Sequence, residues 1–176
     1  IVFLTNESYR FEVLRNHAIP CPVSILYNGV ESEKFYKVED SVKNTLRQKL
    51  GLLQKNIFLW IANNDRPKKG LSIIIEAWKK SNCYKNNEAV LLVIGSNLQK
   101  AQENIQYLGI LSHDELPMYY QAADFFLFTT LCHEGFPLSL TEAIKCGCTC
   151  FVSDIEPMHE VIQNGQLAHS VKSPHM

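Results

Sequence analysis

Two glutamates separated by seven residues, Glu134 and Glu142, bracket the stretch of this sequence with the clearest capacity for chemistry. Gly135 loosens the backbone between them, and Pro137 favours the first turn of a helix. We therefore expect a helix to begin here, with Glu142 about one turn in, roughly 6 Å along its axis. A carboxylate in that place can accept hydrogen bonds from two vicinal hydroxyl groups, which is what a ribose offers.

The backbone at the start of that helix is a candidate anion site. The amides of Gly135, Phe136 and Leu138 lack acceptors within a helix that begins here, so they are expected to point outward. Together with the positive end of the helix dipole, they suit a diphosphate. Taken alone, Glu142 on the second helical turn is more often a solvated residue, and only the whole arrangement favours a ligand contact.

A second anion-binding element is expected in the loop before the helix predicted over 71–80. Lys69 could meet phosphate oxygens there together with Arg66 or Asn64. The alternative is a polar loop that caps the following helix. His133 is a further candidate for contact with a ligand. The other histidines are expected to be surface or capping residues, and Glu160 a surface acid near a helix start.

Composition narrows the class of protein. The 176 residues are 46% hydrophobic and 20% charged, which fits one ordinary soluble domain. A net charge of −1 with scattered basic residues gives no broad surface for nucleic acid. No apolar run reaches membrane-spanning length, and the run from Ile1 to Thr5 is too short for a signal peptide, so the cytosol is the expected location. Cys146, Cys148 and Cys150 lack Cys-x-x-Cys spacing, so buried thiols are expected rather than structural zinc.

The elements that must position these residues alternate along the chain. Buried strands are predicted from β-branched and aromatic runs at Val23 to Tyr27, Ile57 to Ala62, Ala89 to Ile94, Asp124 to Thr129 and Thr149 to Ser153. Helical spacing appears at Ser41 to Leu50, Leu71 to Lys80, Leu116 to Ala123 and Leu138 to Cys146. This alternation predicts an α/β fold with a Rossmann-like, doubly wound parallel sheet. Ligands of such sheets bind beyond the carboxyl ends of the strands.

Three segments are predicted along the chain. Residues 1–30, with a helix at Ser8 to Asn16 between two strands, look like the end of a preceding domain or a linker. Residues 31–165 are expected to form the Rossmann-like domain. Residues 166–176 show no regular pattern and are expected to be an irregular, truncated tail.

In these motifs the sequence resembles the carboxyl-terminal, donor-binding domain of the retaining glycosyltransferases of family four, which have the GT-B fold. The resemblance runs from Asn28 to Gly165, and its strongest part is EGFPLSLTEA over 134–143. It is supported by Lys69-Gly70, Glu76-Ala77-Trp78, Leu92-Val93-Ile94-Gly95, Tyr107-Leu108-Gly109, Glu115-Leu116-Pro117 through Tyr120, Ala123-Asp124, Gly147 and Glu160-Val161-Ile162.

The resemblance implies a role for each matching position. Lys69 meets the donor diphosphate, and the backbone over 136–138 holds its phosphates. Glu142 takes the ribose hydroxyls, while Glu134 approaches the donor sugar as the catalytic residue. The backbone from Leu108 to Leu111 faces the base. The family commonly has Gly-Arg where this chain has Asn63-Asn64, so the second phosphate contact is left open between Asn64 and Arg66.

The implied activity is transfer of a hexose from a UDP- or GDP-sugar to a glycan or a lipid-linked saccharide, as in polysaccharide biosynthesis. No cofactor and no metal are expected. The implied partner is an amino-terminal acceptor domain of the full-length protein, which could also bring peripheral association with the inner face of the membrane. The isolated fragment is expected to be inactive.

Two other classes compete with this interpretation. A dinucleotide-dependent oxidoreductase is disfavoured because the chain contains no Gly-x-Gly-x-x-Gly, and it contains no P-loop either. A non-catalytic nucleotide-binding module with a Rossmann-like sheet remains the alternative. That module would leave the glutamate pair unexplained.

Overall fold

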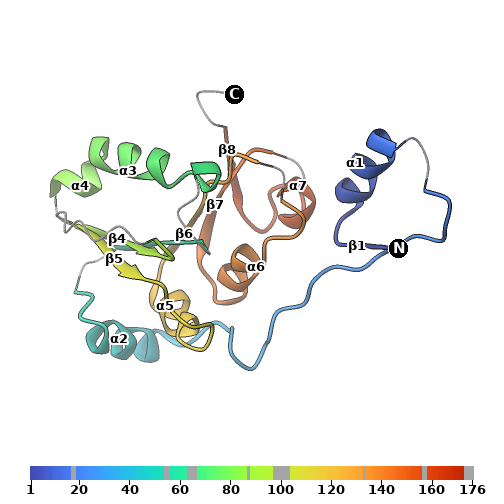
Figure 1. Ribbon diagram of the computed structural model, residues 1–176. Helices are drawn as coiled ribbons and strands as arrows, with labels where there is room; N and C mark the ends of the chain where they lie inside the picture. Colours follow the sequence, from blue (N-terminus) through green and yellow to red (C-terminus); the bar gives the residue numbers. More distant parts are fainter. Residues whose placement is uncertain are drawn as a thin grey trace.

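A six-stranded parallel sheet with helices on both faces forms the main body of the computed structural model (Figure 1). The structure describes residues 1–16, 19–53, 56–62, 67–86, 88–96, 104–132, 134–155 and 158–172. The strand order is β5-β4-β3-β6-β7-β8. Its strands are β3 (Asn56–Ile61), β4 (Ala89–Ile94), β5 (Ile105–Gly109), β6 (Phe125–Phe128), β7 (Thr149–Ser153) and β8 (His169–Val171).

The order of the strands creates a switch point between β3 and β6. The chain first builds outward from β3 through β4 to β5, then returns to place β6 on the other side of β3 and builds outward again. In open α/β sheets the loops at such a reversal separate and leave a crevice at the carboxyl ends of the strands. The predicted doubly wound sheet is therefore confirmed.

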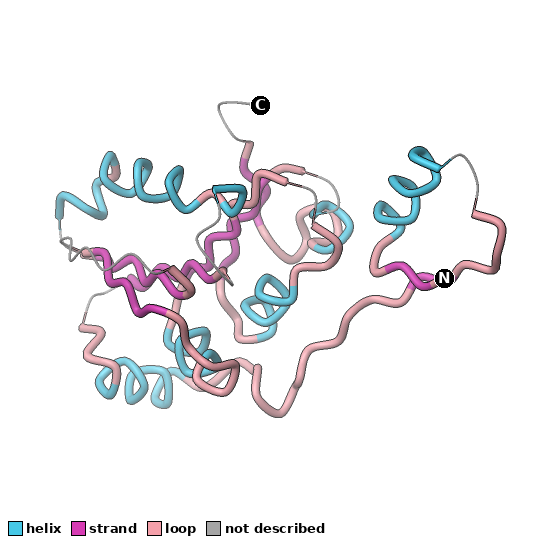
Figure 2. Tube along the Cα trace, viewed as in Figure 1, coloured by secondary structure: helices cyan, strands magenta, loops and turns pink. Residues whose placement is uncertain are grey.

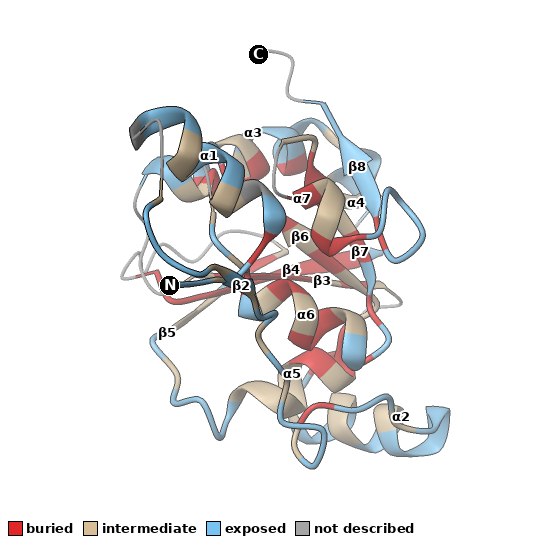
Figure 3. Ribbon diagram, turned by 90° about the vertical axis from the view of Figure 1, so that its right-hand side faces the viewer, coloured by how far each residue is buried: buried red, intermediate tan, exposed pale blue. Residues whose placement is uncertain are grey.

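Helices cover the two faces of this sheet unequally. The first face, here called the α3 face, carries α3 (Leu71–Lys80) and α4 (Asn82–Asn86), and the opposite α6 face carries α2 (Asp40–Lys49), α5 (Leu116–Ala122), α6 (Leu138–Lys145) and α7 (Met158–Val161) (Figure 1). Alternate residues of each strand face opposite sides, so Leu59 and Leu92 pack in the core of the α6 face while Trp60 and Leu91 pack under α3. Figure 3 shows burial concentrated in the central strands and α6, with β8 and α1 largely exposed.

The first residues form a separate small unit. This amino-terminal unit runs to Tyr27 and contains β1 (Val2–Phe3), α1 (Asn6–Asn16) and β2 (Ser24–Ile25), with the two strands paired in parallel. Figure 2 shows this amino-terminal unit beside the main body, joined to it by a long loop that leads to α2. Among the described residues, no helix is long and apolar enough to cross a membrane.

Most predicted elements are confirmed, with small changes at their ends. The helix predicted from Ser8 begins at Asn6, the short helix α4 adds to those that hydrophobic spacing revealed, and α7 is the helix expected near Glu160. One expectation is wrong, because the tail expected to be irregular contributes β8, which pairs with β7 at the edge of the sheet. All three residues of β8 are exposed, so no apolar signal marked it as a strand.

Three cysteines lie in the core of the α6 face, as expected. Cys146, Cys148 and Cys150 are buried and free. Burial raises the pKa of Cys146 and of Cys150 to about 12, and it also raises the pKa of Cys148. A thiol whose pKa is raised in this way holds little thiolate at neutral pH, which is the form that reacts and binds metals.

Candidate functional site

A cavity of about 290 Å³ opens at the switch point between β3 and β6. It is lined by Trp60, Ile61, Ala62, Lys69, Phe128, Thr129, Thr130, Glu134, Phe136, Pro137, Leu138 and Ser139. These residues come from the ends of β3 and β6, from the loops after them and from the start of α6. The cavity therefore lies where a doubly wound sheet is expected to bind its ligand.

Lys69 and Glu134 form an ion pair inside this cavity. Lys69 Nζ lies 2.6 Å from Glu134 Oε1, and the Thr130 hydroxyl donates to the same oxygen at 2.8 Å. Partial burial alone would raise the pKa of Glu134, but the hydrogen bonds from Lys69 and Thr130 outweigh it, so the pKa lies below its ordinary value. Glu134 is consequently an anion at neutral pH, with a cation at hydrogen-bonding distance.

Backbone contacts to the end of β6 fix the position of Lys69. Gly70 has φ of +74°, and a Cβ built there would lie 1.9 Å from the carbonyl oxygen of Thr129. Only glycine permits this approach, because a side chain would collide with backbone. The Lys69 carbonyl also accepts a hydrogen bond from the Thr129 hydroxyl at 3.2 Å, and the Lys68 carbonyl accepts one from the Leu131 amide at 2.7 Å.

Helix α6 starts at the edge of the same cavity, which is lined by Pro137, Leu138 and Ser139. It begins at Leu138, and Pro137 before it has extended backbone. In the described part of the chain, the amides of Gly135, Phe136 and Leu138 donate to no other residue. Unpaired amides at a helix start, with the positive end of the dipole behind them, favour an anion. The cavity thus combines one ammonium group with backbone donors, a suitable set for a diphosphate.

Glu142 occupies the second turn of α6 but does not line this cavity. It is only 6% exposed, so it is not the solvated residue that a glutamate on the second turn of a helix more often is. The Tyr120 hydroxyl donates to Glu142 Oε2 at 2.9 Å, and His113 Nε2 lies 3.2 Å from Oε1. Burial, followed by the charge of Glu142, raises the pKa of Tyr120 well above its ordinary value, so Tyr120 remains a neutral donor.

A small cluster of rings positions the partners of Glu142. The buried Phe35 ring packs 5.2 Å from the His113 ring and 5.7 Å from the Tyr120 ring, measured between centroids. His113 Nδ1 also lies 3.8 Å from the Glu31 carboxylate, so the half-exposed imidazole stands between two acids. His113 is therefore more than the surface or capping residue expected from the sequence.

The family model of the group 1 glycosyl transferases matches residues 42–175. This chain belongs to that family. At 26% identity it is similar to the Escherichia coli UDP-Gal:alpha-D-GlcNAc-diphosphoundecaprenol alpha-1,3-galactosyltransferase, over 93% of the chain and 45% of that protein. It is 25% identical to the phosphatidyl-myo-inositol mannosyltransferase of Mycobacterium leprae, over 64% of the chain and 32% of that protein.

Solved structures show the same fold. WaaG, a glycosyltransferase involved in lipopolysaccharide biosynthesis, superposes with a TM-score of 0.82 at 20% identity, over 98% of this chain and 49% of that one. Anabaena HepE in complex with UDP-glucose gives a TM-score of 0.80 at 18% identity, over 98% and 50%. The structural neighbours are GT-B glycosyltransferases, and this chain spans about half the length of WaaG and of HepE.

The structure brings together only part of the site that was predicted from the sequence. The cavity unites Lys69 with Glu134, Phe136, Pro137 and Leu138, and Gly135 lies in the same loop. Leu108, in β5, and Leu111, just after it, are partly buried against the core of the α6 face and do not line the cavity. Asn64, Arg66 and His133 lie outside the described residues.

Three residues of the site were given no binding role from the sequence. Thr130 binds the Glu134 carboxylate together with Lys69. Tyr120 and His113 both contact the Glu142 carboxylate. Thr130 carried a usable signal, since it directly follows a predicted strand and precedes Glu134. Tyr120 and His113 carried none, because only the packing of α5 and its preceding loop against α6 brings them to Glu142.

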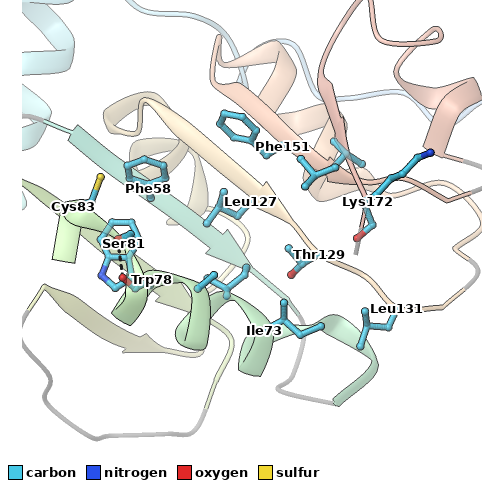
Figure 4. Close-up of a pocket in the computed structure, with 15 residues that line it drawn as sticks. Phe58, Ile73, Trp78, Ser81, Cys83, Leu127, Thr129, Leu131, Phe151 and Lys172 are labelled. Carbon is cyan, nitrogen blue, oxygen red and sulfur yellow. Dashed lines mark hydrogen bonds between the residues drawn. The ribbon is translucent and has the colours of Figure 1, made fainter. Parts of the chain in front are cut away.

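A larger cavity of about 470 Å³ lies on the α3 face and is lined mainly by apolar side chains (Figure 4). Phe58, Leu127 and Phe151 line it from three strands, and Ile73 and Trp78 line it from α3. It contains no predicted site residue. The smaller cavity, which brings Lys69 and Glu134 to the start of α6, is therefore the candidate site.

Proposed function

We propose that this chain is the carboxyl-terminal, donor-binding domain of a retaining glycosyltransferase of family four. In this proposal the full-length protein transfers a hexose from a UDP- or GDP-sugar to a glycan or a lipid-linked saccharide. One observation carries the proposal: the Lys69–Glu134 pair lines one cavity, at the switch point of the sheet, together with the start of α6, whose first amides donate to no other described residue. The names of the E. coli and M. leprae relatives support the donor and acceptor classes.

The cavity can stabilise the leaving group of such a reaction. When the bond between the anomeric carbon and the phosphate oxygen breaks, its electron pair leaves with the diphosphate. An acceptor oxygen bonds to that carbon, and its proton passes to an oxygen of the departing diphosphate. The ammonium of Lys69 and the amides at the start of α6 would face the charge that develops on the diphosphate. Fixed positive groups of this kind lower the barrier because they need no rearrangement during the reaction.

Glu134 has a separate role in the proposal. Its carboxylate is ionised and paired with Lys69, so an incoming diphosphate competes with it for that cation. Glu134 would then be released toward the donor sugar, where it positions hydroxyl groups or stabilises positive charge near the anomeric carbon. Its lowered pKa makes it a poor proton donor at neutral pH.

Glu142 is proposed to receive the ribose hydroxyls. Because the buried Tyr120 holds Oε2, the oxygen available to a ribose is Oε1, which faces the half-exposed His113. The His113 ring must shift as the nucleoside arrives. Tyr120 then holds the Glu142 carboxylate in place through Oε2, while Oε1 changes its partner from His113 to the ribose.

Calorimetry with UDP, GDP, ADP and NAD tests the proposal. We expect the purified chain to bind UDP or GDP more tightly than ADP or NAD. The acceptor half of the cleft is proposed to lie in the remainder of the full-length protein, so we expect no sugar transfer by this chain alone. A folded chain that binds no nucleoside diphosphate, or one that prefers NAD, would contradict the assignment.

A further inference from the structure

One carboxylate oxygen joins the amino-terminal unit to the main body. Glu160, in α7, accepts at Oε1 from the Tyr27 hydroxyl at 2.7 Å, from the Asn6 side-chain amide at 2.9 Å and from the Asn6 backbone amide at 3.0 Å. The Asn6 side chain also donates to the Tyr27 hydroxyl at 3.2 Å. Asn6 is the first residue of α1, so Glu160 satisfies an amide at the start of a helix in another part of the chain. Glu160 is thus the surface acid near a helix start that was expected, and it also holds two residues from the amino-terminal part of the chain.

The same tyrosine reaches the loop of the candidate site. The Tyr27 ring packs against the Phe136 ring, with centroids 6.0 Å apart and planes tilted by 46°. Phe136 also packs against the core of the α6 face, so it lies between that core and Tyr27. On the neighbouring residue, a Cβ built on Gly135 would lie 3.8 Å from Leu4 Cδ1, which is ordinary contact distance. The amino-terminal unit thus flanks both Gly135 and Phe136.

These contacts matter because the loop cannot be held by the amides proposed to bind the ligand. The amides of Gly135, Phe136 and Leu138 form no hydrogen bond with another described residue. Lys69 and Thr130 hold Glu134 at one end of the loop, so side-chain packing is needed to order Gly135 and Phe136 before the ligand arrives. A loop that is already ordered loses less conformational entropy when the ligand binds, so the protein binds that ligand more tightly.

We propose that Tyr27, held by Glu160, is a positioning residue that orders the loop over 134–138 for the donor diphosphate. This inference rests on the proposed function, because it assigns the loop to the diphosphate. Tyr27 supplies the ring that covers Phe136, and Glu160 fixes the hydroxyl end of that ring relative to α7. The amino-terminal unit is thereby coupled to nucleotide binding through two residues.

Calorimetry with UDP and GDP on matched variants tests the coupling. Tyr27→Phe keeps the ring but loses the hydroxyl, and we expect it to weaken binding about threefold to tenfold. Glu160→Ala should cause a similar loss, whereas Glu160→Gln retains an acceptor oxygen and should stay near the wild type. The double variant Tyr27→Phe, Glu160→Ala should lose no more than either single variant. Tyr9→Phe is the control, because the Tyr9 ring packs on Phe3 within the amino-terminal unit.

A second measurement needs no ligand. Nuclear magnetic resonance relaxation should report lower order parameters at the Phe136 amide in Tyr27→Phe than in Tyr9→Phe, at equal thermal stability. Unchanged affinity and unchanged order in Tyr27→Phe would overturn the inference. If the wild type binds no nucleoside diphosphate, the proposed function fails, whereas the relaxation data still decide whether Tyr27 orders the loop.

Discussion

Lys69 Nζ lies 2.6 Å from Glu134 Oε1, so the cation proposed for the diphosphate is already paired with the carboxylate proposed for the donor sugar. The pair is less than one-third exposed on both sides, which makes it stronger than a typical surface ion pair. A diphosphate that enters the cavity must exchange with Glu134 for the lysine. The exchange of Lys69 from Glu134 to the diphosphate can be tested by substitution.

Lys69→Ala should weaken UDP or GDP binding roughly tenfold or more, since a charge-assisted contact to phosphate is lost. Arg66→Ala should weaken it less, because only Lys69 occupies the position that the family resemblance supports. Calorimetry on both variants decides the matter. Equal losses would show that Arg66 supplies the second phosphate contact, and a larger loss at Arg66 would mean that the loop has been assigned wrongly.

The placement of Lys69 depends on the glycine that follows it. Gly70→Ala should destabilise the chain by more than about 2 kcal/mol, because it combines a left-handed backbone conformation with a collision against the Thr129 carbonyl. Gly51→Ala is a matched control, since Gly51 has φ of +68° but nothing within 4 Å of a built Cβ. That control should cost only about 1 kcal/mol in urea unfolding. Equal costs would argue against the close approach of Gly70 to β6.

Asp124 offers a test of the fold through pH. Burial alone would raise its pKa, but hydrogen bonds from Lys43, the Ile57 amide and Arg47 lower it below the ordinary value of 3.8. A carboxyl group whose pKa is lowered by folding stabilises the folded state above its ordinary pKa, and that contribution disappears as the pH falls through the folded-state pKa.

Asp124→Asn should therefore reduce the free energy of unfolding by about 2 to 3 kcal/mol at pH 7, and the difference from the wild type should shrink below pH 3.8. Urea titrations at several pH values measure it. Asp114→Asn serves as the control, because its ion pair with Lys34 is exposed and should contribute nothing measurable. A difference that stays constant down to low pH would contradict the role assigned to the Asp124 charge.

The sequence predicted the buried strands and the amphipathic helices because their apolar spacing is strong. Strand β4, from Ala89 to Ile94, is buried at every residue, and α3 has the predicted ends. Strand β8 was missed because it is short and exposed, and it exists only through its pairing with β7. The hydrophobic pattern of a segment predicts a buried strand. An exposed strand at the edge of a sheet forms by pairing with its neighbour, which the local sequence does not show.

The candidate site was predictable to the same extent. Glu134, Lys69 and the start of α6 meet as expected because parallel strands bring their carboxyl ends to one edge. The burial of Glu142 could not be predicted, since helical spacing does not show that α5 places Tyr120 beside it. The contact between Tyr27 and Glu160 was equally hidden, because it joins residues 133 positions apart.

Glu142 is the residue on which the nucleoside assignment depends. Its carboxylate is buried and already accepts from Tyr120, so Glu142→Gln, which keeps one acceptor oxygen, should cost about 1 kcal/mol of folding stability. The loss of charge-assisted bonds to the ribose, worth roughly 1.5 to 3 kcal/mol, should weaken binding of the nucleoside diphosphate about tenfold or more. Tyr119→Phe, on the same helix as Tyr120, is a control for nonspecific effects.

The most direct measurement compares UDP or GDP with its 2',3'-dideoxy analogue, by calorimetry, on the wild type and on Glu142→Gln. We expect the wild type to bind the dideoxy analogue poorly. We expect Glu142→Gln to bind this analogue no worse than the wild type does. The preference for the ribose form should then fall sharply in the variant. If Glu142→Gln keeps the wild-type preference for ribose, Glu142 does not hold the ribose hydroxyls, and the central claim is wrong.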